Sequence, residues 1–200
     1  FQLLCCPFDA MGATMATYCG QNVGARKLDR LGQGIRACTL LGLVCAVAAF
    51  VGMLLGSDAC AMLFLDPAEP QLELLVALTS QYIVINTAFF FPLALVNIVR
   101  FSIQGMGYST FAILAGVLEM IARTAAAQLF VPPLGYVAAC FASPAAWIAA
   151  DIFLIPASMF CIARLRRLYP VPPVRPQVPE QEEQAMPSPA ASVPARAGIS

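Results

Sequence analysis

Three ionisable residues interrupt otherwise apolar stretches of this sequence and could carry proton or ion chemistry. Glu119 and Arg123 lie one helical turn apart, in the order that favours an ion pair on a helix. Asp151 stands in a later apolar stretch without a basic residue close to it in the sequence. Two acids and one base leave one acid uncompensated, and a bound proton would neutralise the set. We expect a protonatable relay with Arg123 shared between Glu119 and Asp151; the alternative is an internal ion pair that lets the helix insert at low cost.

Other polar and aromatic side chains could extend such a site. Asp9 lies near the start of the chain, and we count it in the candidate relay. The candidate cavity-lining residues are Tyr82, Asn86, Phe90 and Asn97. The two asparagines could coordinate an ion, although hydrogen bonding between helices is the commoner role of such residues in membranes. The aromatic residues could line a cavity for an amphipathic ligand or pack against lipid.

Most other kinds of chemistry have no support in the sequence. It contains no His, which removes the commonest general base and metal ligand. Eight Cys are present without a CxxC pair, and several lie in or beside apolar runs, where Cys behaves as a small hydrophobic residue. Eleven Lys+Arg balance eleven Asp+Glu, so the composition does not indicate a nucleic-acid partner. We expect no enzymatic activity, no cofactor and no metal site, because no nucleophile–base set or phosphate-binding loop appears either.

Membrane helices are the elements that would position these residues. The chain is 60% hydrophobic and only 11% charged, well outside the range of soluble domains. Apolar stretches near the length of a bilayer crossing predict helices at residues 37–56, 74–99, 109–131 and 143–163, after the end of another helix at about residues 1–21. Ser143 and Pro144 fit the N-cap and the first position of the last helix. Pro92 and Pro156 fall inside predicted spans, and we expect them to kink the helices.

Basic and non-basic connections alternate along the chain. Residues 22–36 and 100–108 carry Lys or Arg, whereas residues 57–73 carry acids alone and residues 132–142 carry no charge. The positive-inside rule then places residues 22–36, residues 100–108 and the C-terminus in the cytoplasm, in a multi-pass protein of the cell membrane. Residues 168–200 are rich in Pro, Gln, Ala and Ser, and we expect a disordered cytoplasmic tail there.

Two of the basic connections share a Gln-x-x-Gly pattern, in GQNVGARKLDRLGQG and in RFSIQGMGYSTFAIL. The candidate residues of the two motifs are Gly20, Gln21, Asn22, Gly24, Ala25 and Arg26, and then Gln104, Gly105 and Gly107. Their glycines and amides could form a rigid elbow that ends a helix, with Gln21 and Asn22 capping its carbonyls, or a hinge. Together with the later EMIAR stretch, both motifs resemble, in order and spacing, the second half of a multidrug and toxic compound extrusion (MATE) transporter.

The resemblance covers about residues 5–167 and implies a fold and a function. The fold would be an all-α C-terminal bundle, from the end of helix 8 through helix 12 of a twelve-helix transporter, formed by residues 1–167. The function would be export of cationic or amphipathic compounds by alternating access, driven by Na⁺ or H⁺. The implied partners are a drug-like small molecule, the lipid bilayer and the N-terminal bundle of the same transporter. We therefore expect a fragment that does not transport alone.

One departure from the family leaves the coupling ion open. Some members use an acidic residue of the tenth helix as a cation ligand, but residues 74–99 contain no Asp or Glu. Two other functions remain as alternatives. A flippase for lipid or polysaccharide precursors should have a more basic cavity than one in which Arg123 is the sole intramembrane base. A membrane scaffold would show no substrate-dependent phenotype.

Overall fold

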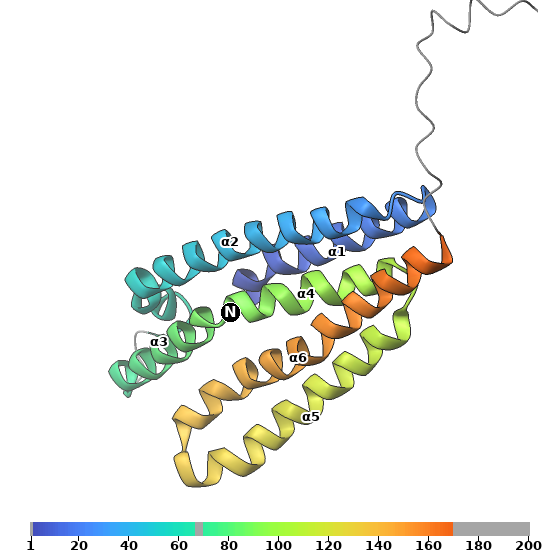
Figure 1. The fold of residues 1–200 in the computed structure, drawn as a ribbon. Helices are drawn as coiled ribbons and strands as arrows, with labels where there is room; N and C mark the ends of the chain where they lie inside the picture. Colours follow the sequence, from blue (N-terminus) through green and yellow to red (C-terminus); the bar gives the residue numbers. More distant parts are fainter. Residues whose placement is uncertain (1, 67–69, 170–200) are drawn as a thin grey trace, which may run out of the picture. The chain divides into compact units, whose positions relative to one another are not determined.

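The computed structural model describes residues 2–66 and 70–169, which form six α-helices without a strand (Figure 1). The helices are α1 (Gln2–Gly24), α2 (Asp29–Met62), α3 (Leu72–Ala88), α4 (Phe90–Gly105), α5 (Ser109–Leu134) and α6 (Tyr136–Leu168). The predicted all-α fold is therefore confirmed for this part of the chain. Most of the predicted tail, residues 168–200, lies outside the described residues.

Three helices, α2, α5 and α6, are long and apolar enough to cross a membrane, and α3 with α4 amounts to a fourth crossing if the bent pair is one span. Large hydrophobic side chains are exposed on these helices, for example Leu55 and Met62 on α2 and Ile152 on α6. A soluble protein rarely exposes so much contiguous apolar surface, whereas lipid accepts it. The chain is a multi-pass membrane protein.

The span predicted at residues 74–99 is divided in the structure into α3 and α4 with a bend of 51° at Phe89, which agrees with the kink expected from Pro92. Pro92 explains where the break falls. Proline has no N–H to donate, and its ring conflicts with the carbonyl four residues earlier, which here belongs to Ala88, the last residue of α3. Pro92 itself lies in the first turn of α4, where a missing N–H costs little.

Several predicted helix boundaries are wrong, because hydropathy marks the part of a helix in lipid and not its ends. The helix predicted at residues 37–56 extends over all 34 residues of α2. The predicted connection at residues 132–142 shrinks to Gly135, which has φ 65° and divides α5 from α6. Pro144 does not begin the last helix but lies buried inside α6. Arg100, which was assigned to a connection, belongs to α4.

Helix α4 lies at the centre of the bundle and contacts each of the other five helices of the described part. It runs parallel to α1, with Phe8 against the ring of Phe90 at 5.3 Å near one end and Gly20 beside Gly105 near the other. The helices α5 and α6 form the most extensive pair, a hairpin that contacts α4 through both members (Figure 1).

The two Gln-x-x-Gly motifs lie at the same end of the bundle, which we call the motif end. It comprises the ends of α1, α4 and α6 and the starts of α2 and α5 (Figure 1). Two cation–π contacts hold these ends together. The Arg26 guanidinium stands 5.6 Å from the centre of the Tyr169 ring, and that of Arg164 stands 6.0 Å from the centre of the Tyr108 ring.

Candidate functional site

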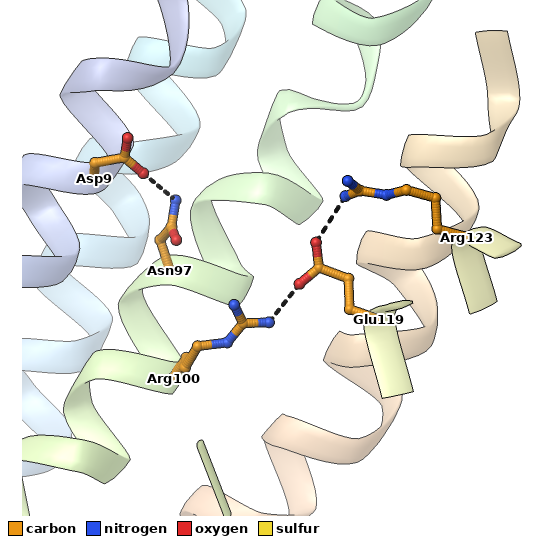
Figure 2. Close-up of polar contacts among 5 residues, drawn as sticks. All are labelled: Asp9, Asn97, Arg100, Glu119 and Arg123. Carbon is orange, nitrogen blue, oxygen red and sulfur yellow. Dashed lines mark hydrogen bonds and ion pairs between the residues drawn. The ribbon is translucent and has the colours of Figure 1, made fainter. Parts of the chain in front are cut away.

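Glu119, on α5, lies between two arginines (Figure 2). Its Oε2 accepts a hydrogen bond from Nη2 of Arg100 at 2.5 Å, and its Oε1 accepts one from Nη2 of Arg123 at 2.9 Å. Arg123 stands one turn further along α5, as the sequence predicts, whereas Arg100 comes from α4. The side chains of Arg100 and Glu119 are 23% and 17% exposed, but that of Arg123 is 49% exposed. The pair of Arg100 and Glu119 therefore links α4 to α5 and is partly buried.

Sequence reasoning missed Arg100 because the predicted span stopped at Val99. Helical side chains lean toward the N-terminus of their helix, so Arg100 reaches back from the motif end and into the bundle. One signal could have revealed it. Phe101 and Ile103 continue the apolar pattern past Arg100, which favours a helix that extends beyond the arginine.

Asp151 is buried on α6, with 7% of its surface exposed, and its Oδ1 has no hydrogen-bond partner among the described residues. The charged side chains that act on it electrostatically are Arg100 and Glu119. The structure does not pair Arg123 with Asp151, so the expected sharing of Arg123 between two acids is wrong. The count of charges also changes, because Arg100 makes two bases for two acids.

Asp9 belongs to a separate polar contact between α1 and α4 (Figure 2). Its Oδ1 accepts a hydrogen bond from Nδ2 of Asn97 at 3.2 Å, with Asn97 buried and Asp9 exposed. No hydrogen bond or ion pair between described residues joins this contact to Glu119. The predicted relay therefore divides into the Asp9–Asn97 pair, the Glu119 cluster and the buried Asp151.

The residues predicted to line a cavity are mostly packed between helices. Phe90 is fully buried against Phe8. Asn86 is fully buried too, and its Nδ2 donates to the carbonyls of Tyr82 at 2.9 Å and of Cys140 on α6 at 3.4 Å. Asn86 thus joins α3 to α6, the commoner of the two roles considered for it.

A cavity of about 640 Å³ opens between α5 and α6, near the turn that connects them. Its lining is apolar and consists of Ala126, Phe130, Leu134, Val137, Ala138, Phe141 and Ala145. It includes none of the four residues that the sequence suggested as cavity lining, since their helices face other neighbours. It also offers no charged partner to a ligand, so only apolar contacts are available there.

The two Gln-x-x-Gly motifs meet where α1 and α4 approach each other. A Cβ atom on Gly105 would collide with the backbone carbonyl of Ala16, and one on Gly20 would lie 3.4 Å from the carbonyl oxygen of Gly105. Only glycine at position 105 permits this approach of the backbones. Gly107 has a different need, because its φ of 90° is a conformation that other residues rarely adopt.

The turn after α1 depends on backbone and amide contacts more than on its glycine. Nδ2 of Asn22 donates to the carbonyl of Tyr18 at 2.8 Å, and the N–H of Ala25 donates to the carbonyl of Gln21 at 2.9 Å. The residue with positive φ is Arg26, at 57°, and not Gly24. The side chains of Gln21 and Gln104 are exposed. The Asn22 bond reaches a carbonyl one turn back inside α1 and not one of the free carbonyls at the helix end, so capping by Gln21 and Asn22 stays a prediction.

The family of the chain follows from its sequence over the region of α1 to α5. The MatE family model matches residues 1–129, more than half of the chain. This chain belongs to the MatE family. The resemblance stated from the two motifs is thereby confirmed. Members of this family are transporters, and the matched region contains Asp9, Arg100, Glu119 and Arg123, whereas Asp151 lies beyond it.

A solved structure agrees with the fold of this MatE chain. It is described as the inward-facing conformation of a multidrug resistance MATE family transporter of the MOP superfamily. The two chains share 17% identity with a TM-score of 0.66, over 81% of this chain and 41% of that one. This MatE chain thus spans about two fifths of the solved transporter, and the likeness is one of fold. Among curated proteins, the comparison finds no sequence match.

Proposed function

We propose that this chain is the C-terminal bundle of a cation-coupled exporter that moves cationic or amphipathic compounds out of the cell by alternating access. The MatE match over residues 1–129 supports a transporter, and the fold of the solved transporter supports a bundle that forms part of a longer protein. In this proposal, the coupling ion is Na⁺ or H⁺ and the remaining helices come from the N-terminal bundle of the same transporter.

The observation that carries the proposal is the buried carboxyl of Asp151 near the Arg100–Glu119 pair. Ionisable groups at membrane depth are costly and are kept mainly for function. A buried carboxylate without a partner is unfavourable, so Asp151 gains stability from a proton or from a cation. Because α4, α5 and α6 each contribute one of these groups, a change of charge at this place acts on three helices at once.

The proposed orientation places the motif end in the cytoplasm of a cell-membrane protein. Arg26 and Lys27 lie between α1 and α2 at this end, Arg30 lies in the first turn of α2, and Arg166 and Arg167 occupy the last turn of α6. Basic residues close to the ends of membrane helices favour the cytoplasmic side. Cysteine labelling from outside intact cells would test the orientation, and labelling at the motif end would contradict it.

Dye efflux from cells that express the intact protein tests the proposed activity. Na⁺ and pH are varied independently, and Asp151→Asn and Glu119→Gln are measured beside Arg36→Gln, an exposed arginine outside the candidate site. We expect the first two variants to lose the cation dependence of efflux and the third to retain it. Wild-type efflux that responds to neither ion would refute the exporter. Cation-coupled efflux that survives both carboxyl substitutions would refute their role in coupling.

A flippase for lipid-linked precursors is a second candidate, and Arg100 favours it. A flippase was disfavoured because the sequence indicated Arg123 as the sole intramembrane base. The structure adds Arg100, which bonds the same Glu119 as Arg123. Guanidinium groups bind phosphate with good geometry. Movement of a fluorescent lipid-linked diphosphate across vesicles that contain the intact protein would support the flippase, and its absence alongside dye efflux would support the exporter.

A further inference from the structure

Two buried atoms of opposite character lack partners near the centre of the bundle. The buried side-chain atoms without a hydrogen-bond partner in the described residues are Asn86 Oδ1, Arg100 Nε and Asp151 Oδ1. The last two are a donor on a cation and an acceptor on an acid. They belong to α4 and α6, which pack against each other, and Arg100 acts electrostatically on Asp151. A hydrogen bond between Arg100 and Asp151 would satisfy both groups.

Glu119 carries one negative charge but is bonded to two positively charged arginines. Arg100 and Arg123 both donate to it, one to each carboxylate oxygen. If Arg100 left, Glu119 would keep the local ion pair with Arg123. Arg100 carries five N–H donors, so its guanidinium is able to turn from one acid toward another.

We propose that Arg100 exchanges partners between Glu119 and Asp151, and that a proton on Asp151 sets which partner it has. The arrangement observed, in which Arg100 binds Glu119, corresponds in this exchange to a neutral Asp151 that holds the proton. In the other arrangement, Asp151 has released its proton to water and its carboxylate accepts hydrogen bonds from Arg100, while Glu119 retains Arg123. The four groups carry a net charge of +1 in the first arrangement and zero in the second, and the proton accounts for the difference.

The surrounding helices supply no other charge that could replace Arg100. The helices packed against α6 are α3, α4 and α5. Their charged residues are Glu73 at the exposed start of α3, Arg100 on α4, and Glu119 and Arg123 on α5. Arg123 is half exposed and bonded to Glu119. Arg100 is therefore the base available to the carboxylate of Asp151.

Through the exchange, binding or release of a proton at Asp151 would change which helices Arg100 joins. With the proton on Asp151, Arg100 ties α4 to α5; without it, Arg100 ties α4 to α6. This inference rests on the proposed ion-coupled function, for which it names H⁺ as the ion at this site. Arg100 would be a positioning residue, because it acts through the two acids and not on the transported compound.

Infrared titration of the purified intact transporter in lipid tests the exchange without relying on transport. The band of the protonated Asp151 carboxyl is identified as the one that Asp151→Asn removes, and its midpoint in pH is measured. We expect Arg100→Gln to raise the midpoint by about one pH unit or more, since the carboxylate loses its cation. We expect Glu119→Gln to lower it, because Arg100 no longer has a competing acid. Arg100→Lys should restore part of the wild-type midpoint, and Arg36→Gln should leave it unchanged.

The carboxylate stretching band of Glu119, identified as the one that Glu119→Gln removes, separates an exchange from a fixed arrangement of charges. Arg100 and Glu119 both act electrostatically on Asp151, so a fixed arrangement already gives midpoint shifts of opposite sign. In an exchange, the Glu119 band shifts at the Asp151 midpoint because Arg100 leaves Glu119 there, and a Glu119 band that stays in place across that midpoint would overturn the exchange. Midpoints that move in the same direction, midpoints that do not move, or the absence of an Asp151 band would each overturn the exchange. Failure of cation-dependent dye efflux in the wild type would instead refute the proposed function, whatever the infrared result.

Discussion

The crossing of α1 and α4 at the motif end makes Gly105→Ala the most informative single substitution for the fold. A Cβ atom at position 105 meets the carbonyl oxygen of Ala16 and lies 2.9 Å from its carbonyl carbon and its Cα. Because these are backbone atoms of a helix, no side-chain rotation relieves the overlap. One of the two helices has to move, and the contact between the two Gln-x-x-Gly motifs has to loosen.

The size of the effect follows from two opposing contributions. Overpacking of this kind costs about 1–3 kcal/mol, and a clash with rigid backbone belongs near the upper end. Replacing Gly by Ala in a helix returns up to about 1 kcal/mol, although Gly105 is the last residue of α4 and gains less. We therefore expect Gly105→Ala to lower the free energy of unfolding by about 2 kcal/mol. For a unit of this size, the melting temperature would fall by about 4–8 °C.

Gly116→Ala is the matched control, because nothing lies within 4 Å of a Cβ atom added there in the middle of α5. It should be neutral or stabilising by up to about 1 kcal/mol. The assay is the thermal unfolding of both variants of the intact protein in one detergent, followed by size-exclusion chromatography with fluorescence detection. A melting temperature of Gly105→Ala equal to or above that of Gly116→Ala would refute the close approach of α1 and α4.

Three further substitutions test the packing of α3 and α4. Phe90→Ala removes a fully buried ring and should cost about 3–5 kcal/mol in thermal unfolding, whereas Leu55→Ala, at a side chain 85% exposed, should change it little; equal effects would contradict the assigned core. Tyr136→Phe removes the 2.6 Å hydrogen bond to the carbonyl of Leu78 and should cost about 1 kcal/mol, seen as faster amide exchange in α3 but not in α1. Ser80→Ala removes the hydrogen bond from α3 to Asp58 on α2 and should cost about 1 kcal/mol or less, with no loss of stability counting against that contact.

Local sequence patterns predict much of this fold, and each failure has an identifiable cause. Charge-free runs of about 20 residues or more locate the apolar parts of α2, α3 and α4, because burial in lipid needs apolar residues. The same patterns do not show where a helix ends in water. Pro92 predicts a distortion of the helix, but the position of the break depends on the carbonyl of Ala88, four residues before it. Gly135 is the single residue between α5 and α6. The neighbouring sequence does not distinguish this one-residue turn from a longer loop that contains a glycine.

The candidate site was predictable only where its residues are close in sequence. The pair of Glu119 and Arg123 follows from their spacing on one helix. The bond from Arg100 to Glu119 joins residues 19 positions apart, and that from Asn97 to Asp9 joins residues 88 apart. These contacts depend on which faces of α1, α4 and α5 meet, and periodicity alone does not determine that. The burial of Asp151 beside Arg100 needed the packing of α4 against α6 for the same reason.

The coupling of export to an inward flow of cations is what we propose for the intact transporter. Its most direct test is uptake or release of a cationic dye by proteoliposomes that contain the intact protein, with a Na⁺ gradient and a pH gradient imposed separately and at zero membrane potential. We expect one of the two gradients to drive the dye against its own concentration and Asp151→Asn to abolish this movement. Dye movement that follows only its own gradient, with either cation gradient present or absent, would contradict the account.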